Sequence, residues 1–251
     1  MQSIKQHVRE GALRPLYLWF ANRYRRLLRL FTYPETASVG RVDYDAYWDE
    51  KFAQGMGGMS EWRLKRARVF ASLVEEGQTV LDLGVGDGAL LKFIIDETGA
   101  TGYGLDISPK AVEFCRQNGL DVDLADVNAP IDTFVTRPYD YIILSEIIEH
   151  IPDPERMLTE LRPHVRNAIV VSVPNTGFYQ HRLRLLFGRF PLQWVVTPGE
   201  HLRFWTHADF LWWADQLGFR VKQAIPYEGV PGMKSVWPGV FAAAFVYVLE
   251  P

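Results

Sequence analysis

The stretch TVLDLGVGDGAL, residues 79–90, decides the fold of this chain. Its nearly continuous apolar run at residues 80–83 predicts a buried strand of a parallel sheet that is covered on both faces. A glycine-rich turn follows, where a ligand can approach bare backbone, and then a helix whose first turn offers free N–H groups. Asp82 stands near the end of the strand, at the edge where open parallel sheets bind ligands. The stretch therefore predicts a ligand-binding crevice.

The glycine spacing alone does not identify the ligand. The glycines are Gly84, Gly86 and Gly88, whereas dinucleotide-binding proteins show G-x-G-x-x-G. A second strand is predicted at residues 102–107, and its Asp106 lies 24 residues after Asp82, about where an acid that reaches ribose hydroxyls falls.

A third predicted strand, residues 121–124, is followed by Asp126. Acids at the ends of three successive strands are hard to explain by core packing. With these residues the chain resembles the class I S-adenosylmethionine-dependent methyltransferases. The resemblance implies that the glycine loop meets the methionine part of the cofactor, that Asp106 binds the ribose and that Asp126 binds the adenine amino group. The full set that the resemblance assigns to the cofactor is Asp82, Gly84, Gly86, Gly88, Asp106, Ile107, Asp126, Val127 and Ser145.

The remaining pattern completes an α/β fold of this class. Further strands are predicted at residues 139–145, 167–173, 219–224 and 240–249, and helices at residues 61–75, 109–118, 154–161 and 206–217. Thr206, with Asp209 three residues later, is a helix-start pattern. We expect a seven-stranded Rossmann-like doubly wound sheet whose terminal pair is an antiparallel addition. The expected domains are a basic helical extension at residues 1–40 and the methyltransferase domain at residues 41–251.

Residues 1–33 differ from the rest in charge. They carry seven Lys and Arg against Glu10 alone, a net +6 in a chain of net −3, which leaves −9 for the remainder. Tryptophan, phenylalanine and leucine recur among the arginines at roughly helical spacing, as in interfacial helices. The segment is read either as a peripheral contact with an anionic membrane or as a helix packed on the domain with solvated arginines.

Composition limits the compartment and the partners. The one cysteine, Cys115, excludes a disulfide framework and fits a reducing cytoplasm. No run of 18 apolar residues predicts a membrane span, and no signal peptide is recognised. The chain is expected to be cytoplasmic, with membrane association left open. The acidic remainder makes nucleic acid an unlikely partner.

A predicted loop near the start of the methyltransferase domain carries the aromatic residues Tyr44, Tyr47 and Trp48, ahead of the glycine-rich residues 54–59. This segment is interpreted either as a lid over the cofactor or as an aromatic staple on the sheet edge.

The most informative segment after the glycine loop is SEIIEH, residues 145–150, directly after the fourth strand. Glu146, Glu149 and His150 stand at i, i+3 and i+4, so one helical turn would place them on one face. Two carboxylates and an imidazole suit a divalent metal or a general base, and His201 could supply a further ligand. Elsewhere in a chain, such a triplet would be interpreted as the solvated face of a helix. Its position directly after the fourth strand favours a functional site.

The E-x-x-E-H triplet, Val173-Pro174-Asn175 and His201 together resemble two groups of O-methyltransferases. These are the ubiquinone-biosynthesis enzymes and the small-RNA 3′-terminal 2′-O-methyltransferases. The resemblance implies a divalent metal between these residues and the acceptor hydroxyls, held by Glu146, Glu149, His150 and His201, and an oxygen acceptor.

A third resemblance covers roughly residues 78–222. The glycine loop at residues 80–88, V-S-V-P-N-T-G at residues 171–177, H-R-L-R-L-L-F-G-R-F-P at residues 181–191 and T-P-G-E-H-L at residues 197–202 are similar to MetW-type methyltransferases. Two departures are Val85, where that group has cysteine, and the E-x-x-E-H triplet, which it usually lacks. Residues 178–194, rich in arginine and aromatics, are interpreted as a substrate cover that could hold phosphate or carboxylate, or as a packed amphipathic helix.

These patterns predict transfer of a methyl group from S-adenosylmethionine to a small-molecule or lipid- or sugar-linked acceptor. Within enzymes, the alternatives are a metal-free reaction with His150 as base, and transfer to nitrogen. From another class, a MetW-like accessory protein would bind the cofactor and regulate a partner enzyme.

Overall fold

A computed structural model describes residues 24, 28, 59–191 and 201–251. The predicted domain boundary at residue 40, the aromatic segment at 44–58, nearly all of the basic residues 1–33 and Trp194 lie outside the described residues. The chain divides into two compact units, Met1–Val39 with Tyr179–Pro198, and Gly40–Phe178 with Gly199–Pro251. Each is described by itself.

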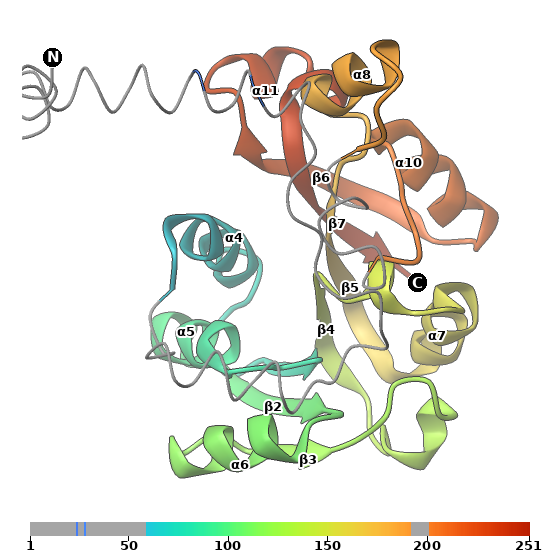
Figure 1. Ribbon diagram of the computed structural model, residues 1–251. Coiled ribbons are helices and arrows are strands. Elements are labelled where there is room, and N and C mark those ends of the chain that lie inside the picture. Colours follow the sequence, from blue (N-terminus) through green and yellow to red (C-terminus); the bar gives the residue numbers. More distant parts are fainter. Residues whose placement is uncertain (1–23, 25–27, 29–58, 192–200) are drawn as a thin grey trace, which may run out of the picture. The chain divides into compact units, whose positions relative to one another are not determined.

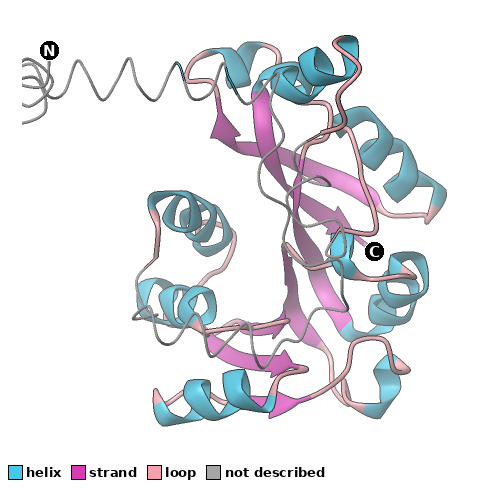
Figure 2. Cartoon of the chain, viewed as in Figure 1, coloured by secondary structure: helices cyan, strands magenta, loops and turns pink. Residues whose placement is uncertain are grey.

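The second unit contains a seven-stranded sheet with the order β3-β2-β1-β4-β5-β7-β6, which confirms the predicted fold class (Figures 1 and 2). Six strands run in one direction, and β7 is antiparallel to both of its neighbours, β5 and β6. The strands are β1 (Thr79–Leu83), β2 (Thr101–Asp106), β3 (Val122–Leu124), β4 (Tyr139–Ser145), β5 (Val165–Pro174), β6 (Arg220–Gly229) and β7 (Ala242–Glu250). The strand order changes direction at β1, so the crevice lies where β1 and β4 end side by side.

Helices cover both faces of the sheet (Figure 1). One face packs against α4 (Glu61–Ala71), α5 (Ala89–Thr98) and α6 (Pro109–Gln117), and the other against α7 (Pro154–Leu161) and α10 (His207–Gln216). Two buried apolar clusters result, one on each face of the strands. This double cover explains why strands such as β1 and β7 are almost continuously apolar.

Several element ends differ from the predicted ones for identifiable reasons. β6 continues to Gly229, past Pro226, because it is an edge strand on which a missing N–H is tolerated. β7 begins at Ala242, since Pro238–Phe241 forms α12 after α11 (Met233–Val236). The predicted Thr206 start of α10 is confirmed as a complete capping box with Asp209.

The first unit contributes α8 (Tyr179–Leu186) to the described residues. In the part of the chain that the structure describes, no helix combines the length and the apolar character needed to cross a membrane.

Candidate functional site

The glycine turn after β1 has a backbone conformation that favours glycine at three positions. Gly84, Gly86 and Gly88 all have positive φ, between 59° and 73°, which side-chain-bearing residues rarely adopt. The Gly86 amide donates to Asp106 Oδ2 at 2.8 Å, and the Ser108 amide donates to Oδ1 at 2.9 Å. Asp106 therefore ties the glycine turn to the end of β2, and the remaining lone pairs of its carboxylate can accept from ligand hydroxyls.

Asp82 is a buried acid, and one of its carboxylate oxygens makes no hydrogen bond within the described residues. It is 1% exposed, and its Oδ1 has no hydrogen-bond partner among the described residues. Burial raises its pKa to about 8, an effect that the positive charge of Arg66 partly opposes. An unpaired buried carboxylate is costly, so the site suits a ligand with a positive group at this position. The cationic end of S-adenosylmethionine fits this requirement.

The other predicted cofactor residues line the same edge of the sheet. Register pairs Leu83 with Leu105 of β2 and with Leu144 of β4, so Asp106 and Ser145 follow immediately at adjacent strand ends. The buried Ser145 Oγ has no hydrogen-bond partner in the described part of the chain. The side chains at positions 107, 126 and 127 complete this edge: Ile107 and Asp126 are exposed and Val127 is buried. Asp126 Oδ1 accepts the amide of Asn128 at 2.9 Å.

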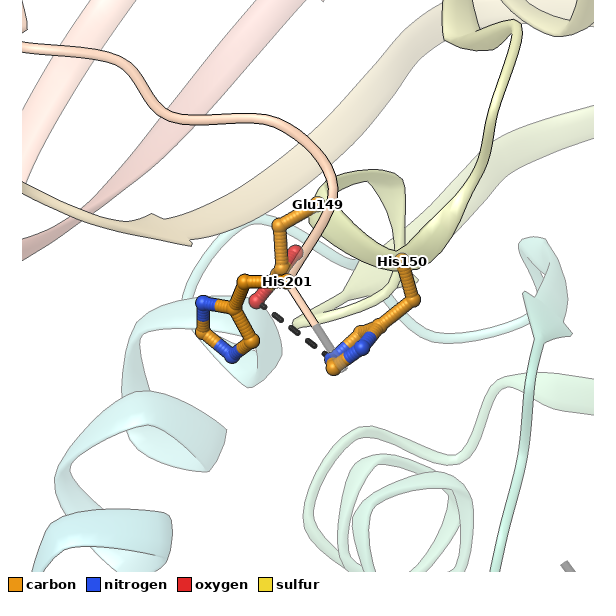
Figure 3. A group of neighbouring side chains, drawn as sticks. All are labelled: Glu149, His150 and His201. Carbon is orange, nitrogen blue, oxygen red and sulfur yellow. Dashed lines mark ion pairs between the residues drawn. The ribbon is translucent and has the colours of Figure 1, made fainter. Parts of the chain in front are cut away.

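A second group of side chains lies beyond the end of β4. Glu149, His150 and His201 each place one ligand atom so that all three atoms lie within 4.8 Å of one another. Figure 3 shows Glu149 and His150 on the turn after β4 and His201 on a facing loop, with the three side chains converging. Glu149 Oε1 lies 4.0 Å from His150 Nε2, and the two imidazole rings meet edge to face at 4.8 Å. Mixed carboxylate and imidazole ligands suit several divalent metals.

The electrostatics of this group also favour a cation. Glu149 is 1% exposed, and neither of its carboxylate oxygens has a hydrogen-bond partner within the described ranges. Burial and the nearby Glu146 raise the pKa of Glu149 well above its usual value. Burial, with His150 adding to it, lowers the pKa of His201 to about 4, so its imidazole is neutral at physiological pH and can donate a lone pair.

Glu146 does not join this group, contrary to the expectation that one helical turn carries all three residues. It adopts a left-handed backbone with φ of 57°, ahead of a 3₁₀ turn at Ile148–His150. Its carboxylate instead lies 3.4 Å from an Arg66 guanidinium nitrogen and 3.2 Å from the Tyr227 hydroxyl that donates to it. A non-glycine residue in this conformation beside a ligand crevice is typical of functional sites.

Arg66 is the cation common to the two groups. It forms the ion pair with Glu146, and its positive charge lowers the pKa values of both Asp82 and Glu149 against their burial. One guanidinium thus faces three carboxylates, two of which are almost completely buried. Burial raises the pKa values of Asp82 and Glu149, so a cation that binds beside either acid would favour its charged form and release its proton.

The described segment from His201 to Trp205 is held by backbone hydrogen bonds at two places. The Glu149 carbonyl accepts the amides of Leu202 and Arg203 at 2.7 and 3.1 Å. At its other end the Trp205 carbonyl accepts the Thr176 amide at 2.9 Å. Asn175 reinforces this end, since its Oδ1 accepts the amides of Gly177 and His207.

A side-chain clamp adds to this loop. Arg203 donates to the Pro152 carbonyl at 2.6 Å and pairs with Glu155 Oε2 at 3.4 Å, and the Trp213 indole donates to Glu155 Oε1 at 2.7 Å. These contacts join the loop to α7 and α10. Sequence reasoning missed Arg66, Tyr227, Arg203 and Glu155, because long-range pairs leave no local pattern. The asparagine of the Val173-Pro174-Asn175 segment was the one available signal for this loop.

Comparison with known proteins identifies a matching family and several similar proteins. The sequence model of a family described as "MetW: Methionine biosynthesis protein MetW" matches residues 65–249. A bifunctional methionine biosynthesis protein MetXA/MetW of Rhodopirellula baltica is 29% identical over 153 residues, which are 55% of this chain and 24% of that protein. The chain therefore matches about a quarter of that relative's length.

A ubiquinone biosynthesis O-methyltransferase of Actinobacillus pleuropneumoniae is 26% identical over 176 residues, 64% of this chain and 74% of that protein. A crystal structure of a SAM-dependent methyltransferase from Archaeoglobus fulgidus superposes with a TM-score of 0.61 at 18% identity. The superposition covers 83% of this chain and all of that one, and it shows that the two share their fold.

Proposed function

The chain belongs to the MetW family and has the fold of S-adenosylmethionine-dependent methyltransferases, and from this premise we propose that it transfers a methyl group from S-adenosylmethionine to a hydroxyl oxygen of a small acceptor. The proposal includes a divalent cation held by Glu149, His150 and His201. The observation that carries it is the pair of buried acids, Asp82 and Glu149, each without a hydrogen-bond partner among the described residues, at neighbouring strand ends.

Asp82 and the glycine turn support the cofactor. When bound, S-adenosylmethionine supplies a methyl group activated by a sulfonium. Asp82 offers its carboxylate to the cationic end of the ligand, and the turn at Gly84 and Gly86 lets the backbone come close. Asp106 retains lone pairs for ribose hydroxyls, and Ile107 and Asp126 stand where the adenine would lie under the class I resemblance.

The Glu149 group supports a metal and an oxygen acceptor. The residues fit a cation because a buried carboxylate and two nearby imidazoles converge on one point. A divalent cation supplies a Lewis acid there. The ubiquinone biosynthesis relative is named as an O-methyltransferase, which favours a hydroxyl over an amine as the acceptor group.

The residues of the chain would act mainly by positioning. Methyl transfer is an in-line displacement, so its rate depends strongly on the alignment of acceptor and donor. Glu149 and the two histidines hold the acceptor end of the site, and Asp82 with the glycine turn holds the donor end. The Arg66–Glu146–Tyr227 contacts fix the backbone between these ends.

The test is a methyl-transfer assay with radiolabelled S-adenosylmethionine. The full chain is incubated with catechols, simple phenols and matched amines, with Mg²⁺ or Mn²⁺ or with a chelator. We expect O-methylated catechols to form when the metal is present and not when it is chelated. Glu149→Gln should lower turnover by at least about 100-fold, while Asp96→Asn, at an exposed pair with Lys92, should leave turnover unchanged.

Each contrary outcome removes one part of the proposal. Turnover that persists with chelator and in Glu149→Gln would contradict the metal. Methylated amines in place of catechols would contradict the oxygen acceptor.

A second candidate is a MetW-like accessory role, which is favoured by the fusion of MetW to MetXA in the Rhodopirellula baltica relative. In that case the chain would bind S-adenosylmethionine but never consume it, and a partner enzyme would copurify with it. The same assay separates the two candidates, because an accessory protein gives no product with any acceptor.

A further inference from the structure

The described part of the first unit presents an apolar surface between arginines. On α8, Arg182, Leu185 and Leu186 stand at i, i+3 and i+4, so they share one helix face, and all three are exposed. Leu186 is 76% exposed, and in the turn that follows Phe187 is 54% exposed. Exposed large apolar side chains grouped in this way mark an interaction site more often than chance exposure does.

This surface is held in a defined shape by a buried arginine. Arg184 is fully buried, and its Nε donates to the Phe190 carbonyl at 2.8 Å. The Arg189 amide donates to the Arg184 carbonyl at 2.7 Å, and Gly188 ends the helix with a positive φ of 70°. These hydrogen bonds tie the turn from Phe187 to Phe190 to the last turn of α8.

Charge is divided sharply between the two units. Residues 1–39 carry seven Lys and Arg against two Glu, and residues 179–198 carry three Arg and no acid, so the first unit has a net charge of +8. The whole chain has −3, which leaves −11 for the other unit. An anionic surface therefore attracts the first unit and repels the second.

We infer that the α8 surface, defined as Arg182, Leu185, Leu186, Phe187, Arg189 and Phe190, binds an anionic lipid surface. Leucine and phenylalanine enter the boundary between head groups and acyl chains, while the arginines pair with lipid phosphates. The inference goes beyond the proposed methyl transfer and does not depend on it. The basic and aromatic composition of residues 1–33 also favours contact with an anionic lipid surface. The α8 surface is a second feature that favours the same partner, and it lies in the described part of the chain.

Lipid is favoured over nucleic acid as the occupant. A surface that binds a phosphate backbone needs arginines with polar or stacking neighbours, whereas exposed leucines gain little from a nucleic acid. Leu185 and Leu186 occupy the exposed face together, and burying such side chains is what an acyl boundary provides.

The test is co-sedimentation of the full chain with vesicles. Vesicles of phosphatidylcholine alone are compared with vesicles that also contain phosphatidylglycerol, at low and high salt. We expect binding to the anionic vesicles that weakens with salt. Leu185→Glu with Leu186→Glu should reduce binding by at least about tenfold, and Arg182→Gln with Arg189→Gln should reduce it about tenfold or more on anionic vesicles.

The matched control is Val236→Glu on α11, a site that is 86% exposed in the second unit. It should bind vesicles as the unaltered chain does, and S-adenosylmethionine titration of each variant checks its folding. Absence of vesicle binding, equal binding by the leucine variant, or an equal loss in Val236→Glu would each overturn the inference. Tight binding of single-stranded RNA without binding of vesicles would assign the arginines to nucleic acid.

Discussion

Gly84 shows how a single residue shapes the crevice. It has a φ of +73°, and a Cβ at this position would lie 2.1 Å from Cδ1 of Ile147, in the turn after β4. The glycine turn and the acceptor side of the site are therefore packed directly against each other. Glycine here satisfies two demands, one on the backbone angle and one on space.

Gly84→Ala should destabilise the protein by about 1–2 kcal/mol for the left-handed backbone, plus a smaller cost for moving Ile147, since the atom that the new methyl group meets is the movable end Cδ1 of that side chain. Urea unfolding measures the change. Gly119→Ala is the control, because Gly119 has a φ of +78° with nothing within 4 Å of its added Cβ, and it should show the backbone cost alone.

The double variant Gly84→Ala with Ile147→Ala should be more stable than the sum of the two single changes predicts, because Ile147→Ala removes the atom that the new methyl group meets. If Gly84→Ala and Gly119→Ala cost the same, the close contact with Ile147 does not matter and this account of Gly84 is wrong.

The acids illustrate which residues the sequence could identify. Asp82, Asp106 and Asp126 were recognisable because each lies at or just beyond the end of a predictable strand, and parallel strands end at one edge. Glu146 was assigned to the same face as Glu149 because a helical turn was assumed. The left-handed backbone at Glu146 and its ion pair with Arg66 depend on tertiary contacts that spacing does not encode.

Among the elements, the segment from His201 to Trp205 positions one side chain of the candidate metal group, His201. It has little regular structure of its own, and it is positioned by the Glu149 carbonyl, by Thr176 and by the clamp of Arg203, Glu155 and Trp213. His201 therefore depends on α7 and α10, which lie on one face of the sheet. Glu155 is a positioning residue in this arrangement.

Glu155→Gln should weaken divalent metal binding by about tenfold, the lower end of effects seen for outer groups that orient ligands. The amide can still accept from Trp213, but it no longer pairs with the charge of Arg203. Calorimetry with Mn²⁺ measures the affinity, and the affinity for S-adenosylmethionine should not change.

Asp96→Asn, at an exposed pair with Lys92, serves as the control for the loss of one surface charge. If Glu155→Gln and Asp96→Asn bind Mn²⁺ alike, the clamp has no influence on His201.

The central strands were predicted more accurately than the short helices that connect β6 and β7. The strands β1, β2 and β4 fall within about one residue of their predicted bounds because buried apolar runs are unambiguous. The short helices α11 and α12 between β6 and β7 were missed, since four-residue helices carry too little periodic pattern.

The chain as a whole combines a widely used sheet with an unusual division of charge. The sheet brings the candidate cofactor and acceptor residues to one edge, and helices cover both of its faces. Because β1, β2 and β4 pair in the middle of the sheet, ligand binding at their ends should stabilise the second unit against global unfolding.

S-adenosylmethionine at 100 times its dissociation constant should raise the free energy of unfolding by about 2.7 kcal/mol. For a chain of this size that corresponds to a rise in Tm of roughly 5–10 °C. Thermal unfolding followed by circular dichroism measures the shift. No shift at saturating ligand would mean that the ligand does not bind the folded sheet.

The central claim is that Asp82 is a buried acid prepared for the cationic end of S-adenosylmethionine. In the free protein its pKa is raised to about 8, so it is mostly protonated at neutral pH. Pairing with a cation favours the charged form and lowers that pKa, so binding must release a proton and the affinity must rise with pH until about pH 8.

The most direct test is calorimetric titration of S-adenosylmethionine at neutral pH in two buffers of different ionisation enthalpy, on the unaltered chain and on Asp82→Asn. The account predicts binding with release of close to one proton from the unaltered chain, and binding at least about tenfold weaker without that proton in the variant. Absence of binding to the unaltered chain, or equal affinity and equal proton release in Asp82→Asn, would contradict it.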